Sequence, residues 1–192
     1  GDKQTKVIGV YSPVGGSGKT TMALVLAMNI ASQCKRVFYL NYEIINSTAE
    51  LLNTAPSGSF SDVLLSVKTK GANVGLRIIA NKHTDHVSKI NFINPSESAL
   101  ELNELTVSEQ VKLIRELDNL GEFDAVVVDF DSSFTPSKLE LLDSCDIILM
   151  PFTADTMSMG KIRLLLKEFS IHGELEGIYK KIRLIVNKFD NK

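Results

Sequence analysis

The sequence contains little cysteine, no long apolar run and no excess of charge of either sign. Its two cysteines, Cys34 and Cys145, are far apart and lack the spacing of metal ligands, which fits a protein of the reducing cytoplasm. No apolar run approaches the roughly 18 residues of a membrane-spanning helix, and the first four residues lack the apolar core of a signal peptide. With 21 Lys and Arg against 23 Asp and Glu, the formal net charge is −2, so bulk electrostatics gives no support for nucleic-acid binding. We therefore expect a cytoplasmic protein without a transmembrane segment.

The composition is that of an ordinary globular domain. Of the 192 residues, 44% are hydrophobic and 23% are charged, so the chain can bury a sizeable core. This length predicts one domain, and the sequence contains no internal repeat and no low-complexity linker. Because the chain begins at Gly1 without an initiator methionine, we expect residues 1–192 to be a fragment of a longer protein.

Short apolar runs alternate with helical stretches along the chain. We expect strands at residues 7–11, 36–40, 76–80, 91–94, 125–129, 147–150 and 182–186. We expect helices at residues 20–32, 47–52, 61–67, 107–120 and 157–171, and a further helix that begins at Thr135-Pro136. The helix from Val107 is the best signalled, because Thr106 and Glu109 form a capping-box pattern. Continuous rather than alternating apolar strands predict an α/β fold with a doubly wound, mostly parallel sheet and helices on both faces.

The strongest motif is a phosphate-binding loop (P-loop) at Pro13–Thr20, between the first strand and the first helix. The glycines of this motif allow backbone N–H groups to face phosphate oxygens, and the following helix N-terminus adds a positive field. Lys19 is expected to contact the β- and γ-phosphates, and the Thr20 hydroxyl is expected to bind Mg²⁺. The alternative interpretation is a glycine-rich strand–helix turn without a ligand.

The segment Gly15–Thr21 resembles the deviant Walker A motif of the ParA/MinD superfamily of ATPases, K-G-G-x-G-K-T-T. The resemblance implies a P-loop fold that binds ATP and Mg²⁺ and dimerises on ATP, with the leading Lys of the motif reaching the phosphates of the partner. Here Val14 stands at the position of that Lys, and Pro13 replaces the usual first glycine. Since a valine supplies no charge to a transition state, Val14 predicts weak hydrolysis.

Two other strands of the chain resemble nucleotide-site strands of this superfamily. Residues 123–129 resemble its Walker B strand, which implies that Asp129 is an outer-shell Mg²⁺ ligand; Asp131 could assist, or be an ordinary solvated acid. After the second strand the superfamily usually has D-x-D, whereas this chain has Asn41 and Glu43. Glu43 retains the charge and is a candidate for positioning the attacking water, and the loss of charge at Asn41 again predicts a weakened hydrolase.

The last predicted strand ends at Asn187-Lys188 and resembles the strand whose Asn contacts adenine in the superfamily. Residues 187–190 also match N-K-x-D, the guanine-recognition motif of GTPases, so GTP is an alternative to the favoured ATP. The predicted catalytic residues are Lys19, Glu43 and Asp129. The predicted nucleotide-binding residues are Gly15, Gly16, Ser17, Gly18, Lys19, Thr20, Thr21, Asn187 and Lys188, and the predicted metal-binding residues are Thr20 and Asp129.

Within the superfamily, the segment Val10–Gly16 and the missing Lys are most similar to the TadZ/CpaE group. That resemblance implies a protein that places Tad-type pilus machinery at a cell pole, with a receiver-like domain ahead of the ATPase domain and further elements behind it. Three functions follow from these patterns: a slow Mg·ATPase switch, an ATP-bound scaffold with negligible turnover, and a DNA-partitioning ATPase. The near-neutral charge gives no support for the third.

Overall fold

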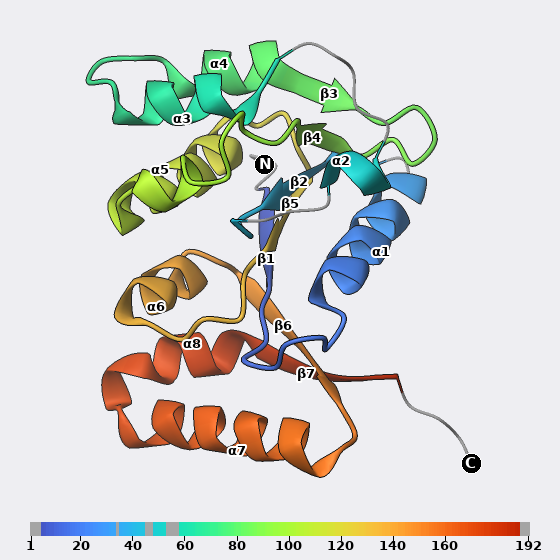
Figure 1. Cartoon of the computed structure of the whole chain (residues 1–192), viewed down its shortest axis with the longest axis vertical. Helices are drawn as coiled ribbons and strands as arrows, with labels where there is room; N and C mark the ends of the chain where they lie inside the picture. The colour runs from blue at the N-terminus through green and yellow to red at the C-terminus, as the bar shows by residue number, and fades with distance from the viewer. Residues whose placement is uncertain (1–4, 34, 45–47, 53–57, 189–192) are drawn as a thin grey trace.

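The strands predicted from apolar runs assemble into one sheet. The computed structural model describes residues 5–33, 35–44, 48–52 and 58–188. Within these residues, seven strands have the order β3-β4-β2-β5-β1-β6-β7 (Figure 1). Neighbouring strands are parallel except β3 and β4, which are antiparallel. The strand bounds are β1 Lys6–Val10, β2 Val37–Asn41, β3 Lys82–Thr84, β4 Asn91–Ile93, β5 Ala125–Asp129, β6 Ile147–Thr153 and β7 Ile182–Asn187.

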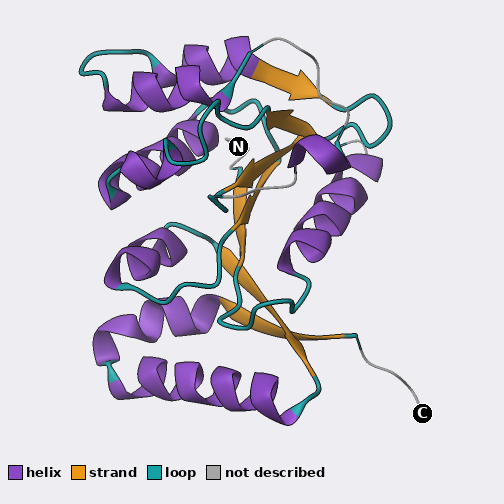
Figure 2. Cartoon of the chain, in the orientation of Figure 1, coloured by secondary structure: helices purple, strands orange, loops and turns teal. Residues whose placement is uncertain are grey.

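Helices cover both faces of the sheet, as predicted (Figure 2). The helix α1 (Lys19–Ser32) lies on one side with the short α2 (Thr48–Leu51), and the remaining helices lie on the other side. The other helix bounds are α3 Phe60–Lys68, α4 Val74–Asn81, α5 Val107–Asn119, α6 Pro136–Asp143, α7 Thr156–Ile171 and α8 Glu176–Lys181, with single 3-10 turns at Leu102–Glu104 and Gly173–Leu175. None of the helices described here is both long and apolar enough to cross a bilayer.

β5 shows why the central strands are continuously apolar. All five of its residues are buried. Val126 and Val128 pack into the hydrophobic cluster beneath α3 to α8, whereas Ala125 and Val127 pack into the cluster beneath α1. Each face of the strand packs against a separate hydrophobic core. A polar residue at either set of alternating positions would therefore be buried among apolar side chains. Asp129 is the exception, and it lies at the carboxyl end of the strand.

The segment 76–80, which we expected to be a strand, is instead the central part of α4. Asn73 caps this helix, because its side-chain oxygen accepts a hydrogen bond from the N–H of Leu76 at 2.9 Å. Val74 and Ile78 are buried, four residues apart, whereas Leu76 is exposed. The helical spacing of the buried residues and the cap therefore outweigh the β-propensity of a short Ile-Ile pair.

The predicted capping box at the start of α5 is present. The Thr106 hydroxyl accepts a hydrogen bond from the N–H of Glu109, and the Glu109 carboxylate accepts one from the N–H of Thr106. These bonds satisfy two N–H groups that have no partner within the helix.

Thr106→Ala is expected to lower the free energy of unfolding by about 1 kcal/mol, because it removes one of these two acceptors. Urea unfolding followed by circular dichroism measures the change. Ser170→Ala is the matched control, since the Ser170 hydroxyl donates to Lys167 O on an exposed helix surface and caps no N–H group. Equal effects of the two substitutions would contradict a stabilising cap.

The parallel strands bring the predicted site residues to one edge of the sheet. In the register, Val10 and Asn41 both lie beside Asp129, so β1, β2 and β5 end at the same level. The P-loop directly follows β1. In the sheet, β1 lies between β5 and β6. The carboxyl edge of an open α/β sheet is where such folds bind ligands.

Candidate nucleotide-binding site

The P-loop has the backbone that its glycines predict. Gly16 has φ +68° and Gly18 has φ +89°, a left-handed conformation in which only glycine avoids strain. Gly18 is also the N-cap residue of α1, so the first N–H groups of the helix begin immediately after it. A β-carbon at Gly15 or Gly16 would meet no atom within 4 Å, so this side of the loop faces open space. A turn with free N–H groups beside a helix N-terminus is suited to bind an anion.

Lys19 is buried at the start of α1, and its ammonium group lies over the loop that follows β5. Its Nζ donates a hydrogen bond to Ser132 Oγ at 2.7 Å. Sequence analysis did not identify Ser132, because a serine in a Ser-Ser loop shows no distinguishing pattern. A bound phosphate would compete with Ser132 for this ammonium group.

Asp129 is fully buried beside the P-loop. Its Oδ2 accepts a hydrogen bond from the Tyr39 hydroxyl at 3.0 Å, whereas its buried Oδ1 accepts none within the described residues. Burial raises the pKa of Asp129 to about 6, and the Glu43 carboxylate also raises it, against the opposing effects of Thr20, Tyr39 and Lys19. A buried carboxylate oxygen without a partner, close to the Thr20 hydroxyl, fits the ligand environment of Mg²⁺.

Glu43 reaches the same point from the end of β2. The Thr20 hydroxyl donates a long hydrogen bond, 3.4 Å, to Glu43 Oε2. Asn41 fixes this turn, because its Oδ1 accepts a hydrogen bond from the Glu43 N–H at 2.8 Å and its Nδ2 donates to Thr48 Oγ1 at 3.3 Å. Asn41 therefore has a structural contact in place of the charge that the superfamily pattern has there.

Asn187 and Lys188, at the end of β7, contact the P-loop backbone. Asn187 Nδ2 donates to the carbonyl oxygen of Ser17 at 2.9 Å, and Lys188 Nζ donates to that of Gly16 at 2.8 Å. The structure thus joins both residues to the predicted site. The other two residues of the N-K-x-D match, Phe189 and Asp190, lie outside the described residues, as does Cys34.

The sequence matches the model of a known protein family. The model AAA_31, described as an AAA domain, matches residues 5–183, which is nearly the whole chain. The chain belongs to the AAA_31 family.

This AAA_31 domain is similar to MinD proteins and to a ParA family ATPase. The septum site-determining protein MinD of Buchnera aphidicola is 27% identical over 125 residues, which are 65% of this chain but only 44% of that protein. A ParA family ATPase from Chlorobium tepidum has a TM-score of 0.77 at 17% identity, over 98% of this chain and 76% of the other. MinD from Pyrococcus horikoshii, solved in complex with Mg-ADP, has a TM-score of 0.72 at 15% identity, over 98% of this chain and 72% of the other. The fold is therefore that of ParA and MinD ATPases, in agreement with the superfamily resemblance.

Val14 of the AAA_31 domain points into the protein core. Its side chain is 8% exposed and belongs to the hydrophobic cluster beneath α3 to α8, and its N–H donates to Ser12 Oγ. At this position the valine stabilises the base of the P-loop by apolar burial. The same side chain cannot extend from the surface toward a second molecule.

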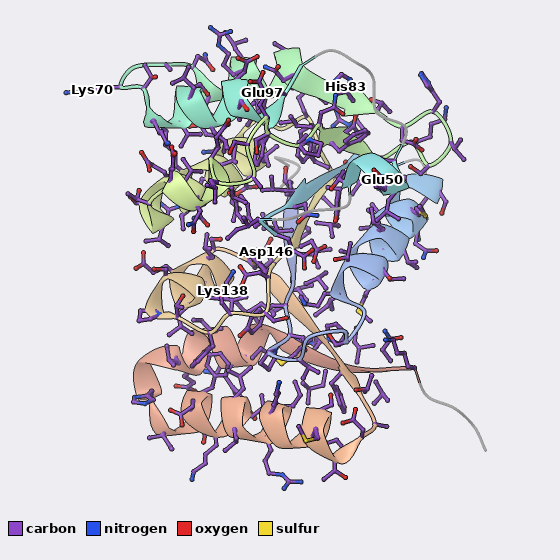
Figure 3. All side chains as sticks on the ribbon, in the orientation of Figure 1. Glu50, Lys70, His83, Glu97, Lys138 and Asp146 are labelled. Atoms are coloured by element: carbon purple, nitrogen blue, oxygen red, sulfur yellow. The ribbon has the colours of Figure 1, made fainter. Side chains whose placement is uncertain are left out.

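An ion pair with a buried lysine holds the loop after β5, and sequence analysis missed it. Lys138, on α6 (Figure 3), has its Nζ 2.7 Å from Asp131 Oδ2, and its side chain is only 5% exposed. Burial raises the pKa of Asp131, but hydrogen bonds from Lys138 and Ser133 outweigh this effect and hold the pKa below its usual value. Asp131 is therefore a paired acid, although its side chain is 37% exposed, and the pair fixes the loop that carries Ser132, the partner of Lys19.

Proposed function

We propose that this chain is a nucleotide switch domain that binds Mg·ATP at its P-loop and hydrolyses it slowly. The observation behind the proposal is the convergence of Lys19, Thr20 and Asp129 at one edge of the sheet, where Asp129 Oδ1 is buried and has no hydrogen-bond partner among the described residues. Burying a carboxylate oxygen without a partner costs free energy, so a cation ligand is the simplest reason for it. The superfamily resemblance and the Mg-ADP complex of the structurally similar P. horikoshii MinD support the choice of nucleotide.

Each residue has a separate role in this proposal. The P-loop N–H groups and the Lys19 ammonium group bind the phosphate oxygens. The Thr20 hydroxyl and the Asp129 carboxylate hold the metal ion, the carboxylate through the outer shell. When bound, Mg²⁺ supplies positive charge that stabilises the phosphates during transfer. Glu43, next to Thr20, accepts a hydrogen bond from the attacking water and so orients it toward the γ-phosphate.

Slow hydrolysis follows from what stands at positions 14 and 41. A buried Val14 adds no cation to the transition state, and Asn41 contributes no charge beside Glu43. The same burial of Val14 favours the second candidate function, a scaffold that stays bound to ATP with negligible turnover. Phosphate release distinguishes the two candidates.

The proposed biological role is to position a cellular machine. On the basis of the TadZ/CpaE resemblance, we propose an ATP-dependent homodimer in the cytoplasm that recruits components of a Tad-type pilus, at a cell pole. The formal net charge of −2 gives no electrostatic support for the DNA-partitioning alternative. Residues 1–192 would then be one ATPase domain of the longer protein.

The test compares the wild-type chain with Lys19→Met. We expect the affinity for Mg·ATP to fall roughly 10- to 100-fold in Lys19→Met, because the substitution removes a charged hydrogen-bond donor to phosphate. Binding is measured by displacement of a fluorescent ATP analogue, and turnover by phosphate release at saturating Mg·ATP. Lys180→Met is the matched control, since Lys180 is 70% exposed and pairs only with Glu176 of its own helix in the described chain.

The outcomes separate the candidate functions. Turnover above that of Lys19→Met identifies the slow ATPase, whereas tight binding with equal turnover identifies the scaffold. If GTP displaces the fluorescent analogue more strongly than ATP does, the preferred nucleotide is GTP and not ATP. Binding by Lys19→Met that equals binding by the wild type would reject the proposed site.

A further inference from the structure

The end of β7 is joined to the P-loop by two hydrogen bonds on consecutive peptide groups. Asn187 Nδ2 lies 2.9 Å from the Ser17 carbonyl oxygen, and Lys188 Nζ lies 2.8 Å from the Gly16 carbonyl oxygen. Asn187 and Lys188 are adjacent in sequence, 170 or more residues from the loop that they contact. Lys188 has φ +54°, an uncommon conformation for a residue other than glycine. The chain therefore adopts a sharp turn where these two side chains meet the loop.

These contacts set the direction of the P-loop N–H groups. In a planar trans peptide the C=O and the following N–H point in opposite directions. When the carbonyls of Gly16 and Ser17 point toward β7, the N–H groups of Ser17 and Gly18 point away from it. Successive N–H groups that point the same way form an anion-binding concavity. Asn187 and Lys188 thus stabilise the shape of that concavity, because they bind the carbonyl groups on the opposite side of the loop.

The Asn187 amide group bonds to Lys188 through its oxygen and to the P-loop through its nitrogen. Its Oδ1 accepts from the backbone N–H of Lys188 at 3.0 Å, and one of its two amide hydrogens is used by Ser17. These partners fix the orientation of the amide, with the oxygen toward Lys188 and the nitrogen toward the loop. The amide therefore holds the Ser17 carbonyl group in a fixed position relative to the end of β7.

We propose that Asn187 and Lys188 are positioning residues of the phosphate site, which act through the backbone of the P-loop. The inference rests on the proposed nucleotide-binding function and assigns these two residues a different role from the adenine contact that the superfamily resemblance implies. It predicts that a ligand with phosphates and no base depends on both residues as strongly as ATP does.

The experiment uses the 192-residue chain with Asn187→Ala, Lys188→Met and the exposed control Lys180→Met. Displacement of a fluorescent ATP analogue gives the affinities for Mg·ATP and for Mg·tripolyphosphate, which lacks the nucleoside. We expect Asn187→Ala to weaken both ligands about 3- to 10-fold, and Lys188→Met to weaken both about 10-fold or more. The ratio of the two affinities should stay constant, and Lys180→Met should change neither.

Hydrogen exchange of the nucleotide-free chain provides the second measurement. The amides of Ser17 and Gly18 should exchange faster in both variants and not in Lys180→Met, while circular dichroism verifies that the fold is retained. Failure of the wild type to bind ATP or tripolyphosphate, with this exchange pattern present, would reject the proposed function and leave the positioning role supported.

Three results would overturn the positioning role. Loss of ATP affinity with unchanged tripolyphosphate affinity would make Asn187 a base-contacting residue. Loss of affinity for both ligands with unchanged exchange would make Lys188 a direct phosphate ligand. Unchanged affinity and unchanged exchange would show that neither residue supports the P-loop.

Discussion

Asp129→Asn is expected to stabilise the nucleotide-free chain by about 2 kcal/mol at pH 8 and to weaken Mg²⁺ binding with the nucleotide about 10-fold or more. The first effect follows from burial, which raises the pKa of Asp129 to about 6 in the folded chain. In the unfolded chain the pKa of an aspartate is about 3.9. Asparagine has nearly the same shape and no charge, so the variant avoids the cost of burying an ionised carboxylate.

The sign of the pH dependence follows from these two pKa values. Below about pH 4 the carboxyl is protonated in both states and costs nothing. Between about pH 4 and 6 the folded chain keeps a proton that the unfolded chain releases, so wild-type stability falls as pH rises. Above pH 6 the cost is constant, and a difference of about 2 pKa units corresponds to roughly 3 kcal/mol. The expected gain in the variant is smaller, because the NH2 group of asparagine replaces the unpartnered Oδ1 and buries two N–H donors there.

The second effect follows from the position of that oxygen. Asp129 Oδ1 has no hydrogen-bond partner within the described residues and lies near the Thr20 hydroxyl, where the proposed Mg²⁺ binds. An amide is a weaker metal ligand than a carboxylate, and changes of this kind cost 10-fold or more in metal affinity. Urea unfolding at pH 5, 6.5 and 8 measures the stability, and titration of nucleotide with and without Mg²⁺ measures the metal effect.

Asp131→Asn is the matched control, two residues along the chain, with the opposite sign. Hydrogen bonds from Lys138 and Ser133 hold the pKa of Asp131 below its usual value despite burial, so its ionised form stabilises the folded chain. Asparagine at position 131 should therefore destabilise the chain at pH 8, and the difference should shrink as pH falls below about 4. An Asp129→Asn chain that is less stable than the wild type at pH 8, or that responds to Mg²⁺ as strongly as the wild type does, would contradict the proposed metal site.

The sequence predicted those parts of the fold that depend on local patterns. The β5 run Ala125–Asp129 and the Thr106 capping box were identified correctly, because burial on both faces and a cap each leave a signal within a few residues. The segment 76–80 was assigned wrongly, because its four apolar residues match either period and the deciding cap at Asn73 lies outside the run. The short edge strand β3 was missed, since Lys82–Thr84 is paired on one side only and shows no apolar alternation.

In the candidate site, too, some residues could be predicted from local sequence patterns and others could not. Lys19, Thr20 and Asp129 could be placed together from sequence, because the P-loop and the end of a buried strand must meet at one edge of a parallel sheet. The contacts of Tyr39, Ser132 and Lys138 could not be predicted, since each depends on how segments distant in sequence pack. Lys138 illustrates the difficulty, because a lysine in the first turn of a helix is usually solvated, and only the nearby Asp131 allows it to be buried.

Gly18→Ala should reduce nucleotide affinity more than about 100-fold and destabilise the nucleotide-free chain by roughly 3 kcal/mol. Gly18 has φ +89°, which alanine adopts only with strain, and its new β-carbon would lie 2.3 Å from Asn187 Nδ2. Either the P-loop or the Asn187 side chain must move, and both movements break the hydrogen bond between Asn187 and Ser17. The N–H groups that face the phosphates would lose their common direction as a result.

Gly16→Ala separates the effect of the backbone from that of the contact. Gly16 also has a left-handed conformation, with φ +68°, but a β-carbon there would meet no atom within 4 Å. We therefore expect Gly16→Ala to destabilise the chain by only about 1 kcal/mol. Adding Asn187→Ala to Gly18→Ala should restore part of the stability, because it removes the clashing amide, without restoring nucleotide affinity. Equal destabilisation by the two glycine substitutions, measured by urea unfolding, would show that the contact between Gly18 and Asn187 does not constrain the P-loop.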